Sequence, residues 1–241
     1  MNDWLDTAQF HPLQNRCIHV WLFQLDLSPV SISRFLPLLD AEEKSRCNRF
    51  VHSVHRDRFI AAHGFMRSVL ELYLQQPAAA LCFAKGEHGK PFFSGRNDLH
   101  FNLSHSQDIA ILAVAGHDIG VDVEYVNRKN DWKKIMQRFY TAPEQKQILS
   151  LPEPLQQRAF FQVWTRKEAH MKVTGQGLYL SPSQFTVSAP PDQAALLDMD
   201  SGQDIRQWQM FDIDLPDTAR DYCACLSLAG TAESLLKFVF L

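Results

Sequence analysis

The chain of 241 residues lacks a long apolar run, a large net charge and a paired cysteine motif. No apolar stretch approaches the roughly 18 residues that a membrane-spanning helix requires. The 24 Lys and Arg residues against 27 Asp and Glu residues give a net charge of −3, which provides no overall attraction to nucleic acid or to an anionic membrane. We therefore expect neither nucleic acid nor membrane as a partner, and any phosphate-binding surface must be a local patch.

The five cysteines are scattered and show no metal-ligand spacing. Cys223 and Cys225 alternate along an apolar segment, which predicts that both side chains pack in a core. An odd number of cysteines without a signal-peptide pattern predicts a cytoplasmic, reducing location. No histidine or cysteine stands at zinc spacing, so a zinc site is not expected.

Hydrophobic periodicity predicts the same order of elements twice: a strand, helices of which the last is long, and then strands. In the first half the expected elements are an irregular arm at 1–16, a strand at 17–27, two short helices at 31–50, a long helix at about 54–75, and strands at 81–86, 101–105 and 109–116. In the second half they are a strand at 119–126, helices near 131–138, 143–150 and 154–174, and strands at 183–189, 205–215 and 221–230.

We interpret this repeated order as a pseudo-duplication. It predicts an α/β (α+β) fold with two lobes in one chain, residues 1–117 and 118–241, each a small sheet packed with a long helix. The cleft between two such lobes is the default place for a ligand. Because both lobes belong to one chain, no dimer is needed to build the cleft, and a monomer is expected.

Two carboxylates share one face of the predicted strand at 119–126. Val121 and Val123 alternate with Asp122 and Glu124, and successive side chains of a strand point to opposite faces. The carboxylates then stand about 6.5–7 Å apart, and they repel one another unless a divalent cation lies between them. An edge strand with a solvated acidic face is the simpler explanation for the pair by itself.

The second long helix adds Glu168 and Lys172 on one stripe with Trp164. The charged pair alone could be a surface ion pair worth a few tenths of a kcal/mol, but a tryptophan on the same stripe indicates the half-buried wall of a cleft. Asp122, Glu124 and Glu168 would make an all-oxygen site suited to Mg²⁺, which keeps water ligands and bridges to phosphate. Mn²⁺ is possible as well.

The first half supplies candidate cations for a phosphate. Lys90 follows a glycine, and His105 stands at the end of a predicted strand between Ser104 and Ser106. An arginine can hold a phosphate through two parallel hydrogen bonds. Each arginine alone is more simply part of a solvated helix face, and His105 could equally be a turn histidine. The arginines concerned are Arg46, Arg49, Arg56 and Arg58.

Four segments carry a resemblance to a known family. In chain order they are GKP at 89–91, FNLSHS at 101–106, GVDVE at 120–124 and WTRKEAHMKVTGQGL at 164–178. Any one of them is weak evidence, but four in this order and spacing are highly specific. The sequence resembles the 4′-phosphopantetheinyl transferase superfamily, in its longer, monomeric, two-lobed, surfactin-synthetase-activating type. Beyond about residue 180 the match is only a pattern of strands.

The resemblance implies a role for each matching residue. Asp122, Glu124 and Glu168 match the Mg²⁺ ligands of the family. Glu168 and Lys172 are the expected catalytic residues, and Lys172 also lies near the pyrophosphate of coenzyme A. The other residues expected to bind coenzyme A are Arg46, Arg49, Arg58 and His105, chiefly at the 3′-phosphate, Lys90 and Pro91 on the adenine side, and Ser104 at the pyrophosphate.

The implied reaction is Mg²⁺-dependent transfer of 4′-phosphopantetheine from coenzyme A to a serine of an acyl or peptidyl carrier protein, with release of 3′,5′-ADP. Such an enzyme activates fatty-acid, polyketide or nonribosomal peptide synthases. Glu168 would take the serine proton, directly or through a bound water, and Lys172 would stabilise the departing 3′,5′-ADP. The carrier would be a small acidic helical domain, with Phe139, Tyr140 and the helices at 143–160 as candidate docking elements.

Two other functions remain open on the sequence. One is a module that senses coenzyme A or a nucleotide without turnover, against which the presence of all the metal-binding and catalytic candidates argues. The other is a metal-dependent phosphodiesterase that uses water, which release of 3′,5′-ADP without any carrier would favour. His170 and Met171 depart from the aromatic–aliphatic pair common at these positions in the family, which predicts a local change in packing.

Overall fold

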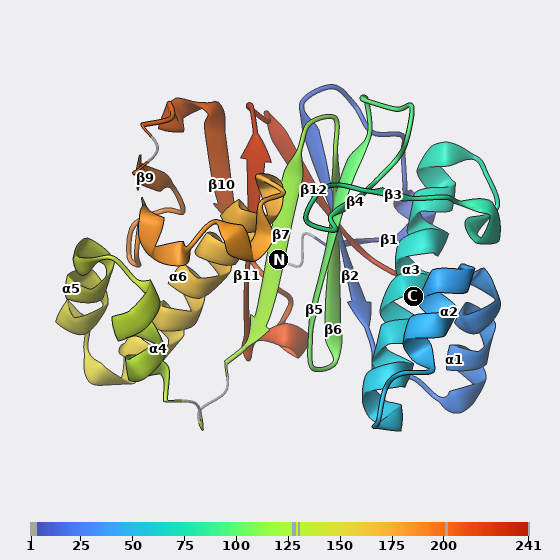
Figure 1. Cartoon of the computed structure of the whole chain (residues 1–241), viewed down its shortest axis with the longest axis horizontal. Coiled ribbons are helices and arrows are strands. Elements are labelled where there is room, and N and C mark those ends of the chain that lie inside the picture. Colours follow the sequence, from blue (N-terminus) through green and yellow to red (C-terminus); the bar gives the residue numbers. More distant parts are fainter. Residues whose placement is uncertain (1–3, 127–128, 130, 201, 241) are drawn as a thin grey trace.

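Two β-sheets stand side by side in the middle of the molecule, and the long helices α3 (Ser53–Leu74) and α6 (Glu153–Val173) lie on opposite sides of them (Figure 1). This arrangement comes from a computed structural model that describes residues 4–126, 129, 131–200 and 202–240. The predicted α/β fold class with two lobes, each a sheet with one long helix, is confirmed.

The first sheet has the strand order β1-β12-β2-β6-β5. β6 pairs antiparallel with both β2 and β5, whereas β12 pairs parallel with both β1 and β2. The elements of the first half are β1 (Trp4–Asp6), β2 (Cys17–Gln24), α1 (Pro29–Phe35), α2 (Ala41–Cys47), α3, β3 (Ala84–Lys85), β4 (Pro91–Phe92), β5 (His100–Ser106) and β6 (Ile109–Ala115).

The second sheet has the order β10-β11-β7 and is antiparallel throughout. Two short strands, β8 and β9, pair separately. The elements of the second half are β7 (Ile119–Tyr125), α4 (Trp132–Phe139), α5 (Ala142–Ser150), α6, β8 (Phe185–Val187), β9 (Leu196–Met199), β10 (Trp208–Asp212), β11 (Tyr222–Ala229) and β12 (Ser234–Val239).

The strand pairing repeats between the halves. In the first half β2 pairs with β6, and in the second half β7 pairs with β11. On their other sides, β6 pairs with β5 and β11 pairs with β10. The repeat ends at β12, which follows the second half but joins the first sheet between β1 and β2. The apolar segment Ser234–Val239 is therefore a strand of the first sheet, and the arm predicted to be irregular contributes β1.

Three apolar cores hold these layers together. The face of β2 with Trp21 and Phe23 packs against α3, and the α6 side of the second sheet packs around Cys225 and Phe160. The third core lies between the sheets, where Ile18 and its neighbours meet Ile119, Val121 and Val123 of β7. The predicted burial of Cys223 and Cys225 is confirmed.

Helix boundaries follow local signals in the sequence. A capping box begins α2: Glu43 N–H donates to the Asp40 carboxylate at 2.8 Å, and Asp40 N–H donates to the Glu43 carboxylate at 2.9 Å. α3 ends at Gln75, whose φ of 52° is left-handed, two residues before Pro77. Several predicted strands are shorter in the structure. The strand predicted at 81–86 is limited to Ala84–Lys85, and the one predicted at 205–215 is limited to Trp208–Asp212.

Within the described residues, no helix combines the length and the apolar character needed to cross a membrane.

Candidate active site

β7 carries an acidic face beside an apolar one, as its alternation predicts. Ile119, Val121 and Val123 are fully buried in the core between the sheets. Asp122 is buried and Glu124 half-buried on the opposite face. The acidic face is therefore not the solvated edge that the simpler explanation required.

α6 packs against β7 at Gly120, where the two backbones approach closely. A Cβ atom at this position would overlap the carbonyl oxygen of Ala169 and the amide nitrogen of Val173. Only glycine permits this approach. It places Asp122 and Glu124 beside the last two turns of α6, which carry Glu168 and Lys172.

The ammonium group of Lys172 connects the helix to the strand. Its Nζ donates to Asp122 Oδ1 at 2.6 Å, to Ser104 Oγ at 2.9 Å and to the Val121 carbonyl oxygen at 3.1 Å. These bonds use all three protons of the ammonium group. The predicted grouping of Lys172 with the acidic strand is thus present.

β5 runs beside β7, and its side chains take the place of a backbone ladder between the sheets. Asn102 Oδ1 accepts from Val121 N–H at 2.8 Å, and Ser104 Oγ accepts from Val123 N–H at 3.4 Å. Ser104 Oγ also donates to Asp122 Oδ1 at 2.9 Å. β5 of the first lobe is therefore joined to the backbone of β7, and Ser104 also contacts the acidic face of that strand.

One atom of this cluster has no partner. Asp122 Oδ2 is buried and accepts no hydrogen bond in the described part of the molecule. A buried carboxylate oxygen without a partner costs free energy, and a divalent cation would supply the missing interaction. No three His, Cys, Asp or Glu side chains among the described residues are gathered closely enough to hold a metal by themselves, so water or substrate oxygens would have to complete the coordination, as Mg²⁺ favours.

The carboxylates of the site have altered acidities. Burial and the nearby Asp122 raise the pKa of Glu124 to about 7, although the Ser106 hydrogen bond and Lys172 act in the opposite direction. Burial and Asp122 also raise the pKa of Glu168. Crowded carboxylates of this kind favour bound cations and are frequent at functional sites.

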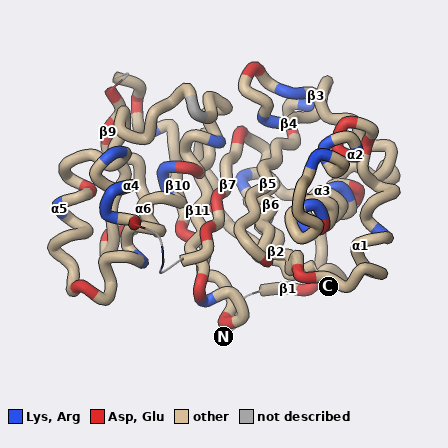
Figure 2. Tube along the Cα trace, turned by 60° about the horizontal axis from the view of Figure 1, so that its bottom comes forward, with Lys and Arg blue, Asp and Glu red and all other residues tan. Residues whose placement is uncertain are grey.

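Cavities open on the first lobe beside these residues. One of about 440 Å³ is lined by Arg46, Phe59, His63, Pro91 and Asn102, among others. A second, of about 350 Å³, is also lined by Arg46 and Phe59, together with Arg58 and His105. Figure 2 shows the cationic positions of α2 and α3 on this lobe. Four predicted binding residues thus line neighbouring cavities: Arg46, Arg58, Pro91 and His105.

The cations of this region differ in their surroundings. Arg46 lies over the Phe59 ring at 4.9 Å, and Arg58 pairs with Asp108 at 2.5 Å. Desolvation by the surrounding protein, and then the neighbouring cations, lower the pKa of His105 to about 4, although part of its surface remains exposed. Arg49 is exposed in the turn after α2, where its backbone N–H donates to the Arg46 carbonyl oxygen at 3.1 Å, and it lines neither of these two cavities.

Lys90 joins the two halves at the end of α6. Its Nζ donates to the Val173 carbonyl oxygen at 3.2 Å and lies 3.7 Å from Asp118. Burial lowers the pKa of Lys90, and Asp118 counteracts that shift. The lysine also lines a cavity of about 330 Å³ together with Pro91 and Gly175. The GKP turn thus contacts the C-terminal end of α6.

One curated relative matches almost the whole chain. The 4′-phosphopantetheinyl transferase HetI of Nostoc sp. is 33% identical over 232 residues, which cover 94% of this chain and 94% of the relative. The chain belongs to the 4′-phosphopantetheinyl transferase superfamily. Its N-terminal part, residues 27–117, matches the family model described as 4′-phosphopantetheinyl transferase, N-terminal, and residues 118–227 match the model of the superfamily.

Further relatives agree with this assignment. The 4′-phosphopantetheinyl transferase Sfp of Bacillus subtilis (strain 168) is 31% identical over 166 residues, 69% of this chain and 73% of the relative. The 4′-phosphopantetheinyl transferase psf-1 of Bacillus pumilus is 29% identical over 183 residues, 73% of this chain and 78% of the relative. The predicted family and enzyme class, a 4′-phosphopantetheinyl transferase, are confirmed.

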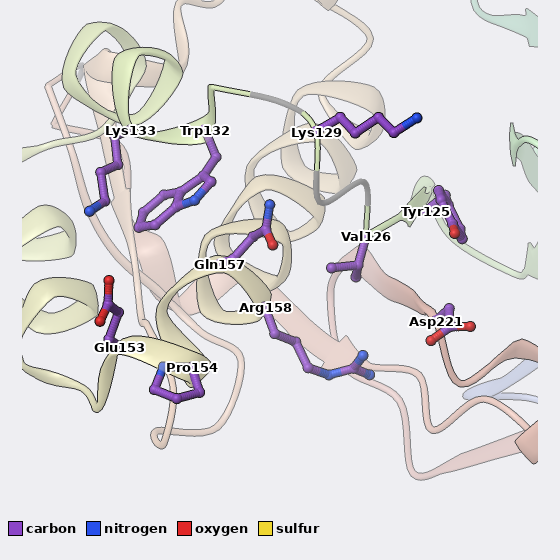
Figure 3. A pocket seen from close by; sticks show the side chains of 10 residues that line it. All are labelled: Tyr125, Val126, Lys129, Trp132, Lys133, Glu153, Pro154, Gln157, Arg158 and Asp221. Atoms are coloured by element: carbon purple, nitrogen blue, oxygen red, sulfur yellow. The ribbon is translucent and has the colours of Figure 1, made fainter.

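Another cavity of this transferase lies just past Glu124. It has a volume of about 780 Å³, and Figure 3 shows its side chains, which come from the end of β7, from α4 and from the start of α6. Lys133 lies over the Trp132 ring at 5.4 Å there. The lining residues are Tyr125, Val126, Lys129, Trp132, Lys133, Glu153, Pro154, Gln157, Arg158 and Asp221.

The prediction that Tyr140 helps to dock the carrier is wrong. Tyr140 is only 4% exposed, and its hydroxyl donates to the Phe160 carbonyl oxygen at 2.7 Å. Phe139 is half-buried with its ring edge-on to Trp164. Aromatic residues at the end of an amphipathic helix pack in a core as readily as they form a docking surface, and periodicity does not separate the two.

A buried ion pair between α6 and α5 was not predicted from the sequence. Lys167 Nζ lies 2.8 Å from Glu144 Oε1, and both side chains are almost completely buried. Lys167 also donates to the carbonyl oxygens of Pro182 and Phe185. Glu144 lies 23 positions before Lys167 in the sequence, and no spacing rule connects the two.

Proposed function

We propose that this transferase moves the 4′-phosphopantetheine group of coenzyme A to a serine of an acyl or peptidyl carrier protein, with Mg²⁺ as the cofactor. The observation that carries the proposal is the unpaired, buried Asp122 Oδ2 in a cluster with Lys172 and beside Glu168. The names of the relatives support phosphopantetheinyl transfer. The choice of carrier protein and of metal goes beyond the names of the relatives and is part of the proposal.

Asp122, Glu124 and Glu168 would hold the cation. Mg²⁺ or Mn²⁺, when bound, would neutralise charge on the pyrophosphate. The donor set fits such an ion, because it is entirely oxygen and leaves positions for water. Oδ2 is the Asp122 oxygen proposed to bind the cation, because Oδ1 already accepts hydrogen bonds from Lys172 and Ser104.

Coenzyme A would bind along the cavities of the first lobe. Arg46, Arg49, Arg58 and His105 are the proposed contacts to its 3′-phosphate, and guanidinium groups suit that role. Lys90 and Pro91 would lie on the adenine side, and Ser104 at the pyrophosphate. This placement is supported by the cavities that Arg46 and Pro91 line next to the β5–β7 cluster.

Glu168 and Lys172 would carry out the proton and charge steps. The serine oxygen of the carrier attacks the phosphorus that bears pantetheine, and the bond from that phosphorus to the oxygen of 3′,5′-ADP breaks. Glu168 would take the serine proton, directly or through a bound water. Lys172 stabilises the negative charge of the departing 3′,5′-ADP, so positioning and electrostatics account for most of the rate.

The test is the intact mass of apo carrier proteins after incubation with this protein, coenzyme A and Mg²⁺, with EDTA as the control. A metal-dependent gain of one phosphopantetheine on a fatty-acid, polyketide or peptide carrier is the expected result. No gain on any of the three carriers, with coenzyme A still bound, would overturn the proposal. Release of 3′,5′-ADP without a carrier would point to hydrolysis instead.

We further propose that the carrier docks over the cavity in Figure 3, because Lys133 and Arg158 suit an acidic domain and Trp132 adds apolar surface. Lys133→Glu should raise the KM for the carrier and leave the KM for coenzyme A unchanged. Lys134→Glu is the matched control, because Lys134 is exposed and pairs with Asp131 outside the cavity. Equal effects of both substitutions would exclude this docking site.

The remaining expectations are a monomer and a cytoplasmic location. Both lobes of the site come from one chain, which supports the monomer. All five cysteines are unpaired, which agrees with a reducing compartment. Sedimentation analysis of the pure protein and fractionation of cells test the two statements separately.

A further inference from the structure

Ser106, at the end of β5, contacts the second carboxylate of β7. Its Oγ donates to Glu124 Oε2 at 2.9 Å, and it accepts from the Tyr125 backbone N–H at 3.1 Å. A backbone N–H can only donate, so it occupies a lone pair of the hydroxyl. The single proton of Ser106 is then directed to Glu124 whenever that carboxylate is ionised.

The contact belongs to a repeating pattern along β5. Asn102, Ser104 and Ser106 are alternate residues, and each accepts from a backbone N–H of β7. Only the two serines also reach a carboxylate, Ser104 at Asp122 and Ser106 at Glu124. The bonds from the β7 backbone join the two lobes. The hydroxyl protons of the two serines are instead donated to the carboxylates of Asp122 and Glu124.

We infer that Ser106 is a positioning residue for Glu124: its hydroxyl holds Oε2 and thereby directs the carboxylate toward the divalent cation. The inference rests on the proposed metal site. Glu124 is the more exposed member of the acidic pair, and a glutamate has three rotatable side-chain bonds, so an unsupported carboxylate would lose rotamer freedom on binding the cation. A hydrogen bond from a neighbour that fixes a metal-binding carboxylate improves metal affinity by about 10–100-fold.

Ser106 also lines the cavity with Arg58 and His105, so a direct contact with coenzyme A is the competing explanation. The two explanations differ in what they affect. A positioning residue changes the affinity for the cation in the absence of any substrate. A substrate contact changes the KM for coenzyme A and leaves the cation unaffected.

Mn²⁺ binding to the substrate-free protein, followed by the electron paramagnetic resonance signal of the free ion, separates them. Ser106→Ala is expected to weaken Mn²⁺ binding by about 10-fold or more. Ser106→Thr keeps the hydroxyl and should restore the affinity to within about twofold. Asn102→Ala is the matched control: it removes a bond between the lobes that involves no carboxylate, and it should lower the thermal unfolding midpoint without weakening Mn²⁺ binding.

Each other result overturns the inference in a distinct way. If the unsubstituted protein binds no Mn²⁺, the proposed metal site fails together with the inference. If it binds Mn²⁺ and Ser106→Ala binds equally well, the metal site stands and the positioning role is wrong. Equal losses for Ser106→Ala and Asn102→Ala would make Ser106 a purely structural link. Ser106→Cys, which keeps the size but has a weak donor, replaces Ser106→Ala if that variant does not fold, and a several-fold loss of Mn²⁺ affinity is expected.

Discussion

A Cβ atom on Gly120 would overlap the carbonyl oxygen of Ala169. This close approach brings β7 against α6. Gly120 precedes Asp122 by two residues on β7, and Ala169 follows Glu168 on α6, so the two carboxylates are brought to the same contact. The separation between the strand and the helix sets the distance between the proposed metal ligands. A change at Gly120 should therefore affect the chemistry as well as the packing.

Gly120→Ala is expected to destabilise the protein by about 1–3 kcal/mol through overpacking. It should also reduce kcat/KM by about 100-fold, since a displacement near 1 Å is enough for such a loss. Thermal unfolding and carrier modification rates check the two effects. Gly116→Ala is the matched control, because its Cβ would meet nothing closer than the Asp98 carbonyl oxygen at 3.9 Å. Normal activity of Gly120→Ala would show that the strand and the helix can shift without cost.

The buried pair of Lys167 and Glu144 supports the other side of α6. Lys167→Met leaves the Glu144 carboxylate buried without its cation, so we expect a loss of about 3–5 kcal/mol in the free energy of unfolding. Urea unfolding measures the loss, and Lys146→Met, at an exposed position of α5, should change it little. The double variant Lys167→Met/Glu144→Gln should recover part of the stability, because it removes the unpaired charge. No recovery would mean that Lys167 acts mainly through its bonds to Pro182 and Phe185.

Much of the site could be predicted from the sequence because its determinants are local. The alternation around Asp122 and Glu124 identified both faces of β7, and the spacing of Glu168 and Lys172 placed them on one stripe of α6. The capping box at Asp40 was equally local. These features depend on residues two to four positions apart, where the periodicity of strands and helices fixes the geometry.

Features that depend on distant residues could not be predicted in this way. β12 lies between β1 and β2 in the sheet, and its Leu235 pairs with Ile18, more than 200 positions away in the sequence. Asn102 and Ser104 of β5 accept hydrogen bonds from backbone N–H groups of β7 that lie 19 positions later in the sequence. Only the tertiary fold brings these groups together. The burial of Tyr140 likewise depends on Phe160, on another helix.

His19 makes the stability of the protein dependent on pH. It is fully buried, its Nδ1 lies 2.8 Å from the Tyr73 hydroxyl, and its Nε2 has no partner. Burial, and secondarily His11, lower the pKa of His19 to about 4 from an ordinary 6.5. Because the unfolded state then binds the proton more tightly, the stability from this residue is complete above the ordinary pKa and is lost as the pH falls from about 6.5 toward about 4.

Between about pH 7.5 and pH 5, His19 should account for a loss of about 2 kcal/mol in the free energy of unfolding. His19→Phe, which fits the surrounding aromatic cluster of Phe10 and Phe238, should reduce the pH dependence by that amount. Urea unfolding at the two pH values measures it. His170 has a similarly lowered pKa of about 4 through burial, so part of the pH dependence should remain. An unchanged pH dependence would show that His19 is not protonated on unfolding in this range.

Glu168→Gln provides the most direct test of the catalytic assignment. The amide keeps the size of the side chain but cannot take a proton, so turnover should fall by at least about 100-fold. Coenzyme A binding should change little, because the cavities of the first lobe remain intact and Glu168 lies on α6 of the second lobe. Carrier modification measured by intact mass gives the rate, and calorimetry gives the affinity for coenzyme A. Glu71→Gln, an exposed glutamate on the other long helix, controls for the loss of one negative charge. Near-normal turnover of Glu168→Gln would remove this carboxylate from the proton step and leave Lys172 as the remaining proposed catalytic group.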